Sequence, residues 1–74
     1  MEDKLKTELM DILEIDEIQE DQVLREFDAW DSLAGLSIII LCNTHYGFTL
    51  TAADLKNLST VGKLAKYIEV HAKR

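Results

Sequence analysis

The spacing of apolar residues is the feature that most constrains what this chain can fold into. In the segment EDKLKTELMDILEI, residues 2–15, apolar residues fall on one face of an α-helix and charged residues fall elsewhere. These apolar residues are Leu5, Leu9, Ile12 and Leu13. A closing segment that begins at Ser59 or Thr60 has the same pattern. Its apolar stripe consists of Val61, Leu64, Ala65, Ile68 and Ala72. Both segments therefore predict amphipathic helices.

Two further helices are predicted between these segments. One extends from Ser32 to Tyr46 and meets a natural stop at Gly47. A short one spans Thr51 to Leu58, because Thr51 and Asp54 have the spacing of a capping box. The alternating segment GFTL is too short to pair as a strand alone. We predict an all-α fold, a small four-helix bundle of three longer helices and a short third helix, as a single domain over residues 1–74.

A long loop is expected between the first and second helices, from Glu14 to Asp31. Loops of more than about 12–15 residues are uncommon in compact domains unless they are functional or disordered. This one contains frequent apolar residues, which disfavour disorder. They are Ile15, Ile18, Val23, Leu24, Phe27 and Trp30. We expect the loop to pack across the bundle, with Trp30 beneath it, and to deliver Ser32 at its end.

Composition and charge exclude several functions. The net charge is −6, and residues 1–32 contain twelve acidic and three basic residues. Such a surface repels phosphate backbones, so nucleic-acid binding is not expected. It can meet basic patches on protein partners, or it can simply aid solubility. The single cysteine, the lack of a signal peptide and the short apolar runs predict a cytoplasmic protein without membrane insertion.

Ser32 follows Asp31 and stands directly before an apolar helix. As a catalytic nucleophile it would need a neighbouring base, and only His45 and His71 are available. His45 lies thirteen residues along the same helix, roughly 20 Å away at 1.5 Å per residue. No G-x-S-x-G elbow is present, so the sequence does not predict an enzyme. Ser32 is then either a helix cap, as Asp31 can also be, or a site of covalent modification.

No metal site is predicted. Cys42 falls on the core side of its helix, where it acts as a small hydrophobic residue. His45 and His71 have no metal-ligand spacing with Cys42 or with a carboxylate cluster. The acidic segment EIDEIQEDQ lacks the glycine and the alternating ligands of a calcium loop.

The second helix carries apolar residues on two sides. The first side contains Ile38, Ile39, Cys42 and Tyr46, with Gly35 and Leu41 at its margins. The opposite side contains Leu33, Leu36 and Ile40, interleaved with Ser37, Asn43 and Thr44. Either both sides are buried, or the second is an exposed contact surface for a partner. We predict a partner-binding surface made of Leu33, Leu36, Ser37 and Ile40.

These features together resemble the acyl carrier proteins. The resemblance rests on Asp31-Ser32-Leu33 after a long loop, on the apolar helix that follows, and on the short helix before LSTVGKLAKYIE. It covers nearly the whole chain and includes its length and acidity. It implies a non-catalytic, monomeric carrier. A phosphopantetheinyl transferase would attach 4′-phosphopantetheine from coenzyme A to Ser32, with Asp31 and Leu33 completing the motif. The thiol of this arm would hold acyl groups as thioesters for acyl-transferring or acyl-activating enzymes, as in fatty-acid biosynthesis.

The chain departs from the family in one respect. The helix after the serine is usually acidic in carriers, whereas Leu33 to Gly47 contains no Asp or Glu. The segment WDSLAGLSIII is similar to free-standing carriers of specialised pathways. Gly35 can either leave space for an acyl chain or simply allow close helix packing. The alternative function is an unmodified helical adaptor that binds a protein through Leu33, Leu36 and Ile40.

Overall fold

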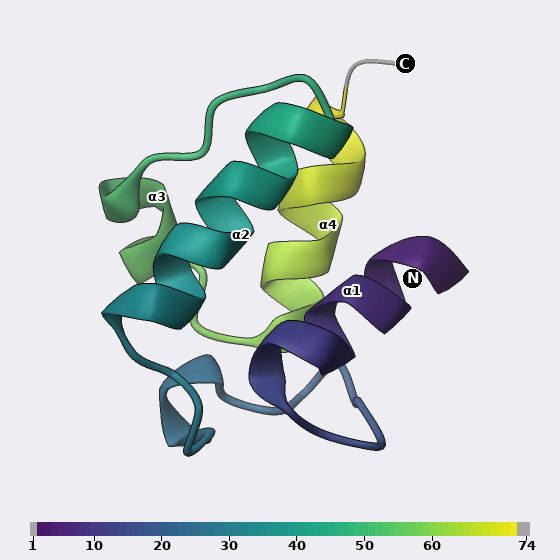
Figure 1. The fold of residues 1–74 in the computed structure, drawn as a ribbon, viewed down its shortest axis with the longest axis vertical. Helices are drawn as coiled ribbons and strands as arrows, with labels where there is room; N and C mark the ends of the chain where they lie inside the picture. Colours follow the sequence, from purple (N-terminus) through teal and green to yellow (C-terminus); the bar gives the residue numbers. More distant parts are fainter. Residues whose placement is uncertain (1, 73–74) are drawn as a thin grey trace.

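The computed structural model describes residues 2–72, and within them the fold is all-α. The four helices are α1 (Asp3–Leu13), α2 (Ser32–His45), α3 (Ala52–Asn57) and α4 (Val61–His71). In Figure 1, α2 lies between the short α3 and the longer α4, and α1 crosses beside them. The four-helix bundle with a short third helix is therefore confirmed. None of these helices is long and apolar enough to span a membrane within the described part of the chain.

The helices begin where short polar side chains can accept hydrogen bonds from free backbone N–H groups. Thr51 and Asp54 form the predicted capping box of α3, with hydrogen bonds of 3.1 and 3.2 Å. The hydrogen bond with Thr51 also lowers the pKa of the Asp54 carboxyl below its ordinary value. At α4 the N-cap is Thr60, whose Oγ1 accepts from the Lys63 N–H at 3.2 Å. The choice between Ser59 and Thr60 is thus decided in favour of Thr60.

The core contains the apolar faces that the spacing predicts. All four helices contribute side chains that are almost inaccessible to solvent, and each fully buried leucine or isoleucine stabilises the fold by about 1.5–3 kcal/mol. These side chains include Leu5, Leu9 and Leu13 of α1, Ile38 and Cys42 of α2, Leu55 of α3, and Val61, Leu64 and Ile68 of α4. Ile12 and Ala72 pack against this core but are only partly buried.

The loop between α1 and α2 is held against the start of α4 by backbone hydrogen bonds. The Leu24 N–H donates to the Ser59 carbonyl at 2.9 Å. In return, the Val61 N–H donates to the Gln22 carbonyl at 3.0 Å, and the Gly62 N–H to the Glu20 carbonyl at 2.8 Å. Together with the Thr60 cap, these bonds satisfy the first three N–H groups of α4, which have no partner inside the helix. The loop therefore completes a helix terminus and is held against it at several points.

The loop also contains structure that the sequence did not predict. A 3₁₀ turn, η1 (Leu24–Glu26), follows an isolated antiparallel bridge between Val23 and Thr60. Leu24 is 2% exposed, and Phe27 and Trp30 pack against the core. The expected role of the loop is confirmed, because it crosses the end of the bundle and leads directly into α2 (Figure 1).

Replacing Gly62 with alanine is expected to destabilise the protein by about 1–3 kcal/mol, the range for overpacking. A Cβ at this position would lie 2.9 Å from the Glu20 carbonyl oxygen and 3.0 Å from its Cβ, so the loop backbone must move. Urea unfolding measures the change. Gly35→Ala is the matched control, because its Cβ would meet only the flexible end of Leu55, at 3.2 Å. A Gly62→Ala protein as stable as the wild type would show that the contact between loop and helix is not tight.

Candidate functional site

Asp31, rather than Ser32, caps α2. Its Oδ1 accepts from the Ala34 N–H at 2.9 Å, and its carbonyl accepts from the Gly35 N–H at 3.0 Å. Ser32 is consequently the first residue of the helix, and it is exposed to solvent. Its hydroxyl makes no hydrogen bond within residues 2–72. Of the two residues that the sequence offered as caps, the structure uses Asp31 and leaves the Ser32 hydroxyl free.

Neither histidine of the chain lies beside Ser32. His45 is the last residue of α2, at the opposite end of the helix. His71 is the last residue of α4, where its Nδ1 lies 2.8 Å from the Tyr67 carbonyl oxygen and its ring stacks on Tyr67 at 4.0 Å. Ser32 therefore has no neighbouring imidazole to act as a base for nucleophilic catalysis.

Other reactive groups are also set apart from Ser32. Cys42 is fully buried, and burial raises the pKa of its thiol to about 11, so the thiol stays protonated and unreactive at neutral pH. Among residues 2–72, no group of three or more His, Cys, Asp or Glu side chains could hold a metal ion.

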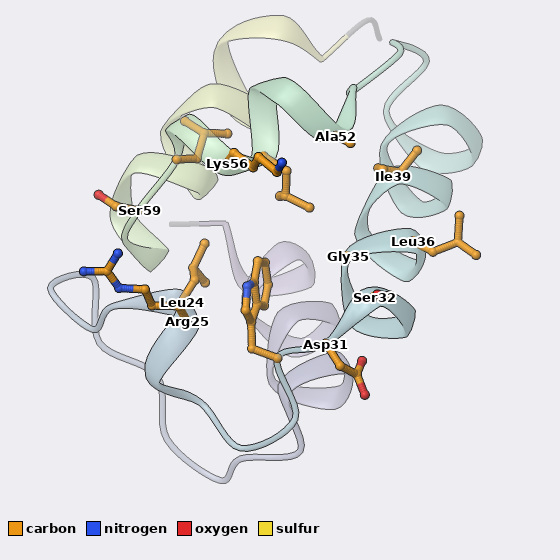
Figure 2. A pocket seen from close by; sticks show the side chains of 13 residues that line it. Leu24, Arg25, Asp31, Ser32, Gly35, Leu36, Ile39, Ala52, Lys56 and Ser59 are labelled. Atoms are coloured by element: carbon orange, nitrogen blue, oxygen red, sulfur yellow. The ribbon is translucent and has the colours of Figure 1, made fainter.

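A cleft of about 650 Å³ opens beside Ser32, between α2, α3 and the loop (Figure 2). From α2 it is lined by Ser32, Gly35, Leu36 and Ile39; from α3 by Ala52, Leu55 and Lys56. The remaining lining residues are Leu24, Arg25, Trp30 and Asp31 of the loop, and Leu58 and Ser59 before α4. Its volume lies within the range of small-molecule sites.

Gly35 sits where α2 and α3 approach each other. Its position is buried, and an added Cβ would lie 3.2 Å from Leu55 Cδ2. Close packing of the two helices, one of the two roles considered for Gly35, is therefore present. The same residue also lines the cleft one turn beyond Ser32, so the lack of a side chain leaves the cleft open at this point.

The sequence did not place two of these residues in the cleft. Ile39 was expected on the core side of α2, but it is only partly buried and lines the cleft. Trp30 packs against the core, as expected beneath the loop, yet it also lines the cleft beside Ser32. The cleft is formed by segments distant in the chain, and the only local sign of it was a glycine three residues after Ser32.

The second apolar side of α2 is exposed. Leu33, Leu36 and Ile40 are 70%, 51% and 54% exposed, so burial of both sides of this helix is excluded. Ser37 lies among them, half-buried, and its Oγ donates to the Leu33 carbonyl at 3.0 Å. We call Leu33, Leu36 and Ile40 the α2 stripe. It begins at the residue after Ser32 and follows the helix.

Comparison with known proteins agrees with this geometry. Residues 3–68 match the family described as phosphopantetheine attachment site. The solution NMR structure of a holo acyl carrier protein from Geobacter metallireducens is similar, with a TM-score of 0.74 and 25% sequence identity. The similarity covers 93% of this chain and 82% of that one. No curated protein sequence matches significantly.

The site also fits the group that this family carries. A phosphodiester-linked arm needs an accessible hydroxyl, and Ser32 offers an exposed one with no competing hydrogen bond in the described residues. The N-terminal end of a helix additionally favours the negative charge of a phosphate. From the family match and the shared fold, the chain belongs to the phosphopantetheine attachment site family, whose covalent cofactor is 4′-phosphopantetheine, and it has the fold of an acyl carrier protein.

Proposed function

We propose that this protein is a non-catalytic acyl carrier whose 4′-phosphopantetheine arm is attached to the Oγ of Ser32. The single observation that carries the proposal is the exposed, unbonded Ser32 hydroxyl at the start of α2, beside the capping Asp31. When bound, the arm supplies a thiol that holds an acyl group as a thioester. The carrier would present such groups to cytoplasmic enzymes of fatty-acid-like or specialised biosynthesis.

The residues around Ser32 hold the attachment point in place. The Asp31 cap stabilises the first turn of α2 by about 1 kcal/mol, so it favours the helical conformation of the Ser32 backbone. The loop before it is fixed at the other end by its hydrogen bonds to Val61 and Gly62. A transferase would therefore meet a serine at a capped helix start, and it would supply the catalytic groups for the transfer.

The α2 stripe is our proposed docking surface for partner enzymes, with Ser37 at its margin. It is exposed, it starts beside Ser32, and no Asp, Glu, Lys or Arg interrupts the helix from Leu33 to His45. A partner that binds here would contact the carrier next to the attached arm. The same exposure favours a second candidate function, an unmodified adaptor that binds a protein through the stripe.

Intact mass after co-expression with a phosphopantetheinyl transferase separates the two functions. A carrier gains the mass of one phosphopantetheinyl group and one thiol that reacts under native conditions, whereas buried Cys42 does not react. A second carrier protein, known to be modified by the same transferase, is expressed in parallel as the control. An unchanged mass beside a modified control contradicts the carrier and favours the adaptor.

Trp30→Ala is expected to lower stability by about 2–4 kcal/mol, a little below the range for fully buried aromatic residues. Trp30 anchors the end of the loop, so the substitution should also slow modification by displacing Ser32. Phe48→Ala is the control, because Phe48 follows the C-terminal end of α2, opposite to Ser32, and is partly buried against Tyr67. It should lower stability without slowing modification. Unchanged stability and modification rate for Trp30→Ala would show that Trp30 is not an anchor.

A further inference from the structure

The cleft beside Ser32 is lined by two cations and one carboxylate. Arg25 of η1 and Lys56 of α3 both line it, and neither forms an ion pair within the described residues. Asp31 is the only carboxylate among the lining residues, and its Oδ1 is engaged with the Ala34 N–H. Figure 2 shows the Asp31 side chain directed away from the cleft. In the same view the Lys56 side chain extends toward the cleft, whereas the Arg25 guanidinium lies at its outer edge, distant from Ser32. The net charge of the lining residues is therefore positive, with one cation inside the cleft and one at its rim.

This positive charge is unusual for its position in the chain. Arg25 is one of only three basic residues among the first 32, which carry twelve acidic ones. Lys56 also suits the C-terminal end of α3, because the helix dipole favours positive charge there. That explains Lys56 by itself, but it does not require that Arg25 lines the same cleft.

The arrangement across the cleft points to the shape of a ligand. Ser32 lies on the α2 side, whereas Arg25 and Lys56 lie on the side formed by the loop and α3 (Figure 2). Apolar side chains line the space between these two sides. They include Leu24, Trp30, Ile39, Leu55 and Leu58. A chain that extends from the Ser32 side would pass hydrocarbon surface first and positive charge at the far side.

We propose that the cleft selects acyl groups that carry a carboxylate at the end distant from the thioester, held by Arg25 and Lys56. This inference rests on the proposed attachment of the arm to Ser32. The apolar lining covers the methylene groups, and the two cations meet the terminal carboxylate. A terminal methyl group gains nothing from the cations, so the two kinds of cargo are bound differently.

The arm's own phosphate is another anion that the two cations could hold. That phosphate is bonded to Ser32 on the α2 side, at the N-terminal end of the helix, where backbone N–H groups already favour it. Arg25 and Lys56 belong to the opposite side of the cleft. The geometry therefore favours the distant carboxylate, and the experiment below distinguishes the two anions.

The test loads the protein with three cargoes of equal chain length. The transferase attaches octanoyl-, suberyl- or monomethyl-suberyl-pantetheine from the corresponding coenzyme A thioesters, and intact mass verifies each product. The rate at which hydroxylamine cleaves the thioester then measures how well the protein shields the thioester. Each rate is divided by the rate for the same thioester on free pantetheine, which corrects for differences in intrinsic reactivity. We expect the suberyl group to be cleaved about 3- to 10-fold more slowly than both neutral cargoes, as expected for two partly exposed ion pairs. Trp30, the only tryptophan, gives a parallel fluorescence signal from the cleft.

Matched variants assign the effect to its residues. The double substitution Arg25→Gln with Lys56→Gln should remove the suberyl preference and leave octanoyl cleavage unchanged. Lys63→Gln with Lys66→Gln removes the same charge from the exposed side of α4 and should change nothing. Raised salt should weaken the preference in the wild type.

Several results would overturn the inference. Equal cleavage of the three cargoes in the wild type contradicts it, as does a preference that survives the Arg25/Lys56 double substitution. If that double variant instead speeds the cleavage of all three cargoes, octanoyl included, by the same factor and changes Trp30 emission in the holo protein without cargo, the cations hold the arm's phosphate. Absence of loading at Ser32, visible as no gain in mass, refutes the proposed function itself and this inference with it.

Discussion

Ser32→Ala is expected to abolish phosphopantetheinylation completely. The arm is joined through a phosphodiester to a serine oxygen, and alanine has none. Ser59→Ala is the matched control and should be modified like the wild type. Ser59 precedes α4 rather than beginning α2, and it lies outside the α2 stripe. Intact mass after incubation with coenzyme A and a transferase measures the result.

The fold of Ser32→Ala should stay intact, because the Asp31 side chain and not Ser32 caps the helix. Circular dichroism and urea unfolding verify this before the modification is compared. A Ser32→Ala protein that still gains one phosphopantetheinyl group would place the attachment at another residue.

The second large effect is expected on the α2 stripe. Leu36→Glu or Ile40→Glu should weaken the binding of a partner enzyme to the carrier by about 10- to 100-fold, because each substitution places a charge where an apolar contact would be buried. Val70→Glu is the matched control, since Val70 is 69% exposed but lies on α4. Titration of one partner enzyme against these variants measures the affinities.

The salt dependence of the same titration identifies what drives docking. Exposed charges are screened over about 8 Å at physiological ionic strength, whereas apolar contact is not. Binding through the stripe should therefore respond weakly to salt. The competing source of affinity is the acidic loop, residues 14–28, which carries seven Asp or Glu residues and one Arg. Steep salt sensitivity, with little effect of either glutamate substitution, would contradict docking on the stripe and favour the loop.

Much of the fold could be predicted because it depends on local patterns. Helical spacing identified the core faces of α1 and α4, and the Thr51–Asp54 spacing identified the capping box of α3. Spacing also placed Leu33, Leu36 and Ile40 together on a second apolar side of α2, but it left open whether that side is buried; the structure shows it exposed. Each of these features is set by residues within a few positions of one another.

The remaining features depend on contacts between distant segments. The bonds from the loop to Val61 and Gly62 involve backbone atoms, which leave no pattern of side chains in the sequence. Which of Asp31 and Ser32 caps α2 could not be decided from residue preferences, because both types are favoured there. The cleft combines residues 24–59, and its cations come from two separate elements. The sequence therefore identified Ser32 but not the cleft beside it.

The most direct test of the carrier function is the intact mass of the protein purified from the cells that produce it. We predict a form heavier than the unmodified chain by one phosphopantetheinyl group located on the peptide that contains Ser32. We also expect further acyl increments that hydroxylamine removes. Detection of only the unmodified mass, in cells whose other carrier proteins are modified, would contradict the carrier function.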